Sequence, residues 1–138
     1  MNITVKIFAA LIVLLLPSAL FAAATPMKEG LWEITTTMEM PGMPYKIPPT
    51  VTTHCYTKED VKDSQKTVPE QKDCKVTEFK SSGNRTTWKM VCKGEHASKA
   101  EGEMIYKGST AYEGTMKMVS EGREMHTKFK SKRIGDCK

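Results

Sequence analysis

Polar and apolar side chains alternate with a period of two along most of the chain after residue 30, and this pattern constrains the fold more than any other feature. In the first such run, Trp32, Ile34 and Thr36 share one face and Glu33 points to the other. Turn-forming residues separate successive runs at intervals of about 8–12 residues. Only Leu31 of six leucines lies beyond residue 24, which disfavours a helical bundle. We predict an all-β fold, a curved antiparallel sheet or partly closed barrel of about seven strands.

The expected strands have clear limits, because Gly, Pro, Ser and Asn interrupt the alternation. One short helix is expected over residues 58–64, since Thr57 followed three residues later by Asp60 is typical of a capped helix start. A loose charged stretch to residue 73 and a polar connection over 93–100 are also expected. The seven strands are expected at 32–40, 50–56, 74–80, 85–92, 101–107, 111–119 and 124–134.

The first 24 residues have the pattern of an export signal. Lys6 precedes an unbroken apolar run over residues 7–16, Pro17 ends it, and the small residues at 22–24 suit a signal peptidase. A membrane anchor is the alternative, although a spanning helix needs about 20 apolar residues. We therefore predict a cleaved signal over 1–24 and a single β domain over 25–138, with no transmembrane segment after cleavage. Loss of Lys6 lowers the net charge from +5 to +4.

Four cysteines lie after the signal, and an exported chain meets an oxidising compartment. Four cysteines allow three pairings. A turn at residues 81–84 folds the chain so that Cys74 faces Cys92 at a distance suited to a disulfide, which leaves Cys55 for Cys137. Zinc sites usually contain cysteines two to four residues apart, a spacing that this chain lacks. We predict two structural disulfides.

Several short motifs occur in a set order after the signal: Gly30-Leu31-Trp32-Glu33, Met38-Glu39-Met40-Pro41-Gly42-Met43-Pro44, Cys55-Tyr56-Thr57-Lys58-Glu59-Asp60, Trp88, Cys92-Lys93-Gly94, Tyr112-Glu113-Gly114 and Arg133-Ile134-Gly135-Asp136-Cys137. Together they resemble the exported bacterial family named domain of unknown function 3617. The resemblance implies a disulfide-paired β domain that is periplasmic or secreted in a Gram-negative bacterium. That family carries no established activity, so the resemblance implies no catalytic residue.

An apolar small molecule is one expected ligand, because curved antiparallel sheets can enclose such molecules. The large side chains on the expected inner faces would line the site: Trp32, Trp88, Met90, Tyr112 and Met116. Aliphatic residues are scarce in this chain, so the alternative role of the same side chains is simply to fill the core. Sequence alone does not separate these two roles.

Copper is the alternative ligand, and no other cofactor is expected. Met38, Met40 and Met43 lie close together in the sequence, with His54 further along, and thioether sulfurs select Cu(I). Nine methionines follow the signal and are spread over the chain, which is also typical of methionine replacing leucine in an irregular core. Convergence of the three sulfurs would distinguish the two interpretations.

A row of Lys128, Lys130 and Lys132 lies on one face of the last expected strand. Such a row suits contact with an anionic envelope surface, or it is the solvated face of an edge strand that lysines protect from pairing. No aromatic residue interleaves with these lysines on their face, so nucleic-acid binding is not expected.

No arrangement typical of an enzyme appears in the sequence. His54, His96 and His126 lack a recognisable nucleophile pattern, and no phosphate-binding glycine loop occurs. Glu101 and Glu103 share a strand face, but paired glutamates there are usually solubility charges. We therefore predict a non-enzymatic binding or envelope-associated module, with Cu(I) handling as the alternative and an enzyme as the least favoured interpretation.

Overall fold

A computed structural model describes residues 24–68 and 72–138, so the expected signal over 1–24 lies outside the described residues except for Ala24. The chain forms the seven strands that the alternation predicts, together with one short α-helix and a 3-10 turn. In chain order the elements are β1 (Gly30–Glu39), β2 (Thr50–Tyr56), α1 (Lys58–Lys62), η1 (Ser64–Thr67), β3 (Cys74–Ser82), β4 (Arg85–Cys92), β5 (Ser98–Tyr106), β6 (Ala111–Ser120) and β7 (Arg123–Gly135).

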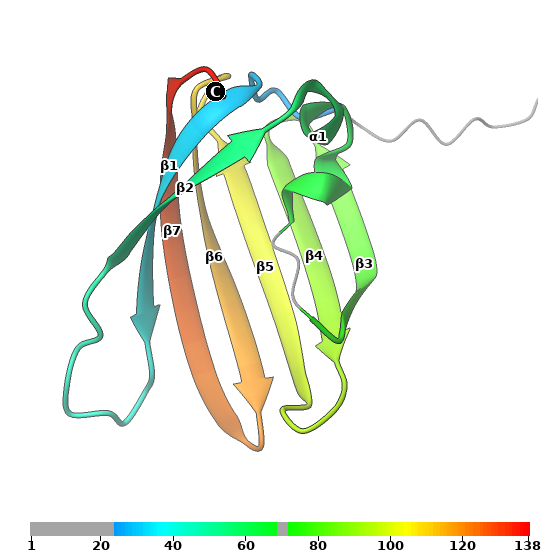
Figure 1. The fold of residues 1–138 in the computed structure, drawn as a ribbon. Coiled ribbons are helices and arrows are strands. Elements are labelled where there is room, and N and C mark those ends of the chain that lie inside the picture. The colour runs from blue at the N-terminus through cyan, green and yellow to red at the C-terminus, as the bar shows by residue number, and fades with distance from the viewer. Residues whose placement is uncertain (1–23, 69–71) are drawn as a thin grey trace, which may run out of the picture.

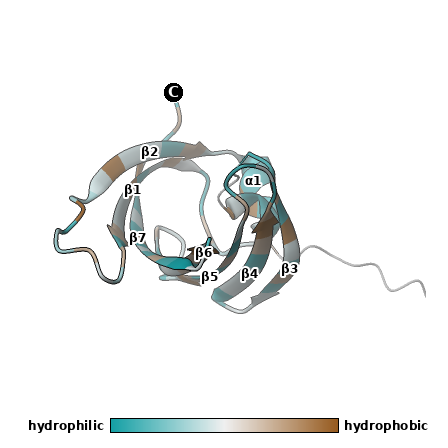
Figure 2. Ribbon diagram, turned by 90° about the horizontal axis from the view of Figure 1, so that it is seen from below, coloured by the Kyte–Doolittle hydropathy of each residue, from teal (hydrophilic) through white to brown (hydrophobic). Residues whose placement is uncertain are grey.

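All seven strands belong to one antiparallel sheet with the order β2-β1-β7-β6-β5-β4-β3. The sheet is strongly curved but does not close, because β2 pairs only with β1 and β3 only with β4 (Figure 1). Viewed along the strands, it forms an open ring, and α1 lies between the two edge strands (Figure 2). The described part of the chain contains no helix both long and apolar enough to span a membrane.

Two expectations about the strands need correction. β5 begins at Ser98, three residues before the expected start, because the small inward residues Ser98 and Ala100 continue the ladder without an apolar signal. β7 is an interior strand between β1 and β6, so the lysine row does not lie on a sheet edge. Pairing between β1 and β7 joins residues about 100 positions apart, which no local pattern records.

The short helix has the expected capping box. The Thr57 hydroxyl accepts from the Asp60 amide at 3.2 Å, and the Asp60 carboxylate accepts from the Thr57 amide at 2.8 Å. α1 ends at Lys62, two residues early, and η1 follows where a loose stretch was expected. The Thr25 amide and hydroxyl both donate to the Val61 carbonyl at 3.0 Å, and so fix α1 to the start of the domain.

Both disulfides join the expected cysteines. Cys74 and Cys92 are directly opposed in the β3–β4 ladder with Cα atoms 3.9 Å apart. Cys55 on β2 is bonded to Cys137 beyond β7, with Cα atoms 5.7 Å apart. The second bond therefore ties an edge strand to the end of the chain.

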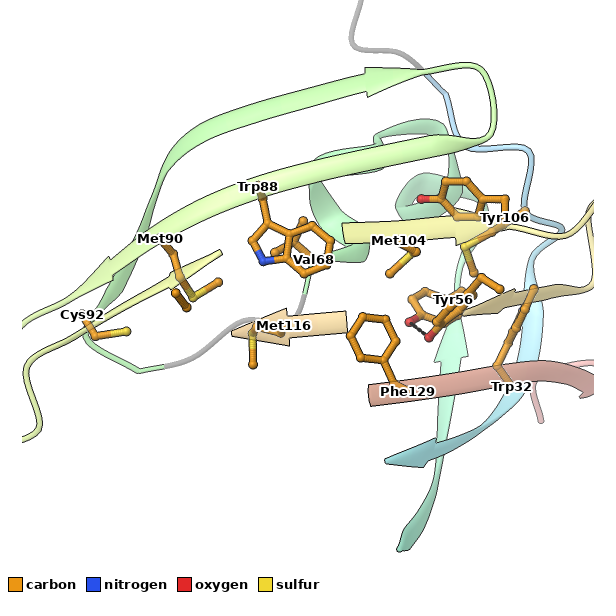
Figure 3. Packing of buried hydrophobic residues seen from close by; sticks show 13 residues of the cluster. Trp32, Tyr56, Val68, Trp88, Met90, Cys92, Met104, Tyr106, Met116 and Phe129 are labelled. Carbon is orange, nitrogen blue, oxygen red and sulfur yellow. Dashed lines mark hydrogen bonds between the residues drawn. The ribbon is translucent and has the colours of Figure 1, made fainter. Parts of the chain in front are cut away.

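The core lies on the concave side of the sheet and is rich in aromatic rings and methionines (Figure 3). Trp32 is completely buried, its indole N–H donates to the Lys28 carbonyl at 3.1 Å, and its ring stacks on Tyr112 at 5.5 Å. The remaining buried hydrophobic residues include Met27, Tyr56, Val68, Trp88, Met90, Cys92, Ala100, Met104, Tyr106, Met116 and Phe129. Methionine and tyrosine thus occupy positions that leucine fills in many domains.

Gly30 lies two residues before Trp32 and allows close contact between the first motif, residues 30–33, and the last motif, residues 133–137. It adopts φ +141°, and a Cβ atom there would lie 2.4 Å from the Gly135 carbonyl oxygen and 2.6 Å from Arg133 Nε. Arg133 Nε donates to the Glu29 carbonyl at 2.8 Å, and its guanidinium also contacts Asp136. A side chain at residue 30 would therefore displace the contacts that hold both ends of the domain together.

Candidate functional site

The concave side of the sheet contains a cavity of about 870 Å³. Cavities that bind small molecules usually have volumes of roughly 300–1,000 Å³ and mostly apolar walls. Apolar side chains from β1, β5, β6, β7 and the segment after η1 line this cavity: Ile34, Met38, Met104, Tyr112, Met116, Met125, Phe129 and Val68. The site is therefore a pocket with soft, adaptable walls rather than a fully packed core.

Two glycines let large aromatic rings lie against the backbone of the neighbouring strand. Gly102 is the cross-strand partner of Trp88, and a Cβ atom there would lie 2.3 Å from the indole ring. Gly114 is the partner of Phe129, and its added Cβ would lie 2.4 Å from the phenyl ring. Glycine in a strand interior often marks such a close approach, which is the signal that could have predicted this packing. Trp88 therefore packs on Gly102 in the core beside the cavity, and Phe129 packs on Gly114 in the cavity wall.

Polar groups gather where β2 meets the α1–η1 segment. The cavity wall there includes Thr52, His54 and Tyr56 from β2, and Asp60, Lys66 and Thr67 from α1 and η1. The Thr67 hydroxyl donates to the Ser64 carbonyl at 2.7 Å and lies 3.2 Å from the Tyr106 hydroxyl, so η1 is fixed to β5. The remaining polar lining residues are Thr36 and Thr127. We call the group His54, Asp60 and Lys66 the charged rim.

Asp60 in the charged rim is already engaged by the helix cap. Its Oδ2 accepts from the Thr57 amide and from the Thr57 hydroxyl, both at 2.8 Å. The hydrogen bond from the Thr57 amide lowers the pKa of Asp60 most, and the Thr57 hydroxyl lowers it further; Lys66 and His54 act in the same direction. His54 packs edge-on against the Tyr56 ring at 4.5 Å. The rim therefore holds one ionised carboxylate with a local partner and two basic side chains close by.

A pair of tyrosines forms the polar floor of the cavity. The hydroxyls of Tyr56 and Tyr112 lie 3.0 Å apart and share a hydrogen bond (Figure 3). Burial raises the pKa of Tyr56 well above its ordinary value, and the nearby Tyr112 raises it further. Burial also raises the pKa of Tyr112, although hydrogen bonds from Tyr56 and Ser131 partly offset this. Both hydroxyls are neutral hydrogen-bonding groups at physiological pH.

This pair predicts a loss of stability at high pH. The unfolded chain releases its tyrosine protons near pH ~10, whereas the folded chain keeps those of Tyr56 and Tyr112. The full stabilisation is therefore present below pH ~10 and declines as the pH rises further. In an absorbance titration at alkaline pH, at least two of the four tyrosines should ionise only as circular dichroism reports unfolding. Smooth ionisation of all four in a folded chain would contradict the burial of this pair.

The predicted lining residues divide into two groups. Tyr112 and Met116 line the cavity, whereas Trp32, Trp88 and Met90 are buried in the core beside it. Sequence reasoning did not name Val68, nor Asp60 and Lys66 of the charged rim, as lining residues; it named His54 only as a copper ligand, and the capping pattern at Thr57 was the one signal of structure near α1. It also did not name Met104, Met125 and Phe129 as lining residues, although the alternation places Met125 and Phe129 on the strand face opposite the lysine row.

The groups considered for Cu(I) lie in two places. Met38 and His54 both line the cavity, while Met40 and Met43 lie beyond the end of β1, where the Met43 amide donates to the Met40 carbonyl at 3.2 Å. Met40 is 39% exposed. Among the described residues, His, Cys, Asp and Glu side chains do not gather in groups of three that could hold a metal ion.

The outer face of the sheet carries a second hollow of about 440 Å³ between β3 and β7. Its lining includes charged side chains that form ion pairs, such as Lys89 with Glu78 at 3.2 Å, and Lys117, which pairs with Glu124 at 2.8 Å. Lys128 and Lys132 of the lysine row likewise pair with Glu39 and Glu33. Lys130, the third lysine of the row, is in none of the ion pairs within 4 Å among the described residues, so this exposed face is only partly paired, and it is a weaker candidate than the concave cavity.

Comparison with known proteins adds the family. The family model described as protein of unknown function DUF3617 matches residues 27–137, which is nearly all of the described chain. No curated protein and no solved structure gives a significant match. The match includes both halves of the Gly30–Arg133 contact and all four cysteines. The chain therefore belongs to the DUF3617 family, whose function is unknown.

Proposed function

We propose that this protein is a non-enzymatic binding module of the bacterial envelope that holds an apolar small molecule in its concave cavity. The observation that carries the proposal is the cavity of about 870 Å³, whose lining includes four methionines and the rings of Tyr56, Tyr112 and Phe129. A ligand would gain from burial of its apolar surface, at roughly 25 cal/mol per Å² removed from water. Flexible methionines would let the walls adapt to its shape.

Export to the periplasm is part of the same proposal. The export pattern over residues 1–24 supports it, and so does the use of all four cysteines in disulfides, which persist in oxidising compartments. A carrier or sensor of apolar molecules is useful there, since such molecules cross the aqueous periplasm poorly unless a protein shields them from water.

The experiment is titration of the oxidised domain with N-phenyl-1-naphthylamine, an uncharged fluorophore that brightens in apolar surroundings. We expect saturable binding by the unmodified domain. Thr36→Trp on β1 and Thr52→Trp on β2 place a large ring in the cavity wall and should weaken binding at least tenfold. The matched controls Thr35→Trp and Thr53→Trp alter the neighbouring residues, which do not line the cavity, and should bind as the unmodified domain does.

Thermal melts of all four variants separate blocked binding from unfolding. Two pairs on different strands keep the test informative if one cavity variant fails to fold. Absence of saturable binding by the unmodified domain would contradict the proposal. Equal weakening in a cavity variant and its neighbour control would also contradict it, because the effect would not depend on the concave face.

A further inference from the structure

The charged rim lies in the wall of the cavity beside its apolar lining. Lys66 and His54 reach the same opening from different elements, η1 and β2, and both are exposed. In the part of the chain that the structure describes, the ion pairs within 4 Å involve neither of them. Five lysines elsewhere in the described chain, 89, 107, 117, 128 and 132, have carboxylate partners; Lys66 is among the others, and it is the one lysine of the described cavity lining. Lys66 is thus a charged donor whose partner can come from a ligand.

Asp60 does not change this conclusion. Among the described residues that line the cavity it is the only carboxylate, and its Oδ2 accepts two hydrogen bonds from Thr57 at the start of α1. The ammonium group of Lys66 offers three donors and no acceptor. A ligand that satisfies the rim must therefore bring acceptor oxygens, and a negatively charged group would gain a charge-assisted hydrogen bond.

We propose that the ligand is an anionic amphiphile, with its carboxylate or phosphate group at Lys66 and His54 and its hydrocarbon chain in the cavity. This inference rests on the proposed function. The apolar walls begin directly beside the rim, since Val68 follows η1 by one residue and Tyr56 follows His54 by two positions on β2. A molecule bound across this boundary would bury its chain against Met104, Met116 and Phe129 while its head stays at the solvent side.

Calorimetric titration with three twelve-carbon probes tests the inference: dodecanoate, dodecyl phosphate and the neutral dodecanol, each below its micelle concentration. At low ionic strength we expect dodecanoate or dodecyl phosphate, or both, to bind at least tenfold more tightly than dodecanol. The stronger of the two acids would identify the head group. Raising the salt concentration should reduce the preference, because the pair at the rim is exposed.

Lys66→Met removes the charge while keeping a side chain of similar length, and should abolish the preference for the acids over dodecanol. Lys62→Met is the matched control, because Lys62 is an exposed residue of α1 that does not line the cavity, and should keep the preference. Thermal melts establish that both variants fold, and Lys66→Gln gives a second test if Lys66→Met does not.

The failures of the two proposals are distinguishable. Dodecanol binding as tightly as both acids, or an unchanged preference in Lys66→Met, would overturn the amphiphile inference while leaving the apolar cavity intact. Failure of all three probes to bind would overturn both, and would agree with a negative result for the uncharged fluorophore.

Discussion

Replacing both Cys55 and Cys137 with serine is expected to lower the free energy of unfolding by about 4.5 kcal/mol. The bond closes a loop with a sequence separation of 82 residues, so its removal greatly increases the conformational entropy of the unfolded chain. Small domains are typically stable by roughly 5–15 kcal/mol, and the double variant would therefore be marginal. A fall in melting temperature of about 20–35 °C should accompany the loss.

The matched control is the Cys74→Ser/Cys92→Ser variant, which opens a bond with a sequence separation of only 18 residues. The same entropy estimate gives about 3 kcal/mol for this bond. Urea unfolding of the two variants, with circular dichroism as the probe, would measure the difference. A larger loss from the short-range bond would contradict the expected order and would indicate that the β3–β4 hairpin limits the stability of the domain.

The long-range bond should also matter for binding. It ties β2, which pairs with one strand only, to the end of the chain, and β2 carries the cavity residues Thr52, His54 and Tyr56. At temperatures where the Cys55→Ser/Cys137→Ser variant is still folded, we expect weaker binding of the uncharged fluorophore, because an edge strand without its staple opens more often. The Cys74→Ser/Cys92→Ser variant alters the opposite edge and should bind more nearly as the unmodified domain does.

The strands and the Cys74–Cys92 pair could be predicted because both depend on local information, and the long-range Cys55–Cys137 pair then followed by elimination. Alternation with period two marks a half-buried strand wherever it falls, and the turn at Gly83 places Cys74 opposite Cys92 in the hairpin. The helix cap at Thr57 is equally local, since both hydrogen bonds join residues three apart. These features follow from neighbouring residues and need no knowledge of the remainder of the fold.

The order of the strands in the sheet could not be predicted in the same way. β7 lies between β1 and β6, and its row of lysines resembles an edge strand only while its neighbours are unknown. Lys128 and Lys132 pair with Glu39 and Glu33 of β1, about 90 to 100 residues earlier in the chain. Such pairs become visible once the sheet is assembled, because chain distance and spatial distance are unrelated at that separation.

The presence of the cavity could not be predicted from the sequence either, because it also depends on how distant segments assemble. Inward apolar residues line a cavity or fill a core according to whether the opposite wall comes within contact distance, and that depends on sheet curvature and on η1. Tyr112 and Met116 line the cavity, while Trp88 and Met90 on the same concave face are packed in the core. Lys66 of the charged rim could not be placed either, because η1 was expected to be a loose stretch.

Trp32→Ala is expected to have the second large effect, with a loss of about 3–5 kcal/mol in unfolding free energy. The Trp32 side chain is completely buried, stacks on Tyr112 at 5.5 Å and meets the Tyr56 ring edge-on at 6.0 Å. Its removal would leave a cavity behind the tyrosine pair and an unpaired Lys28 carbonyl, since the indole N–H now donates to it. Urea unfolding measures the loss.

Trp32→Phe is the graded control, because it keeps an aromatic ring but loses the indole N–H, and it should cost less than Trp32→Ala. Trp32 also supports Tyr56, so the losses from Trp32→Ala and Tyr56→Phe should not add: in contact, such changes typically couple by about 0.5–3 kcal/mol. Additive losses would mean that Trp32 stabilises the domain without positioning the cavity floor. Non-additive losses, together with ionisation of the tyrosine pair at lower pH in Trp32→Ala, would show that Trp32 positions the tyrosine pair that lines the cavity.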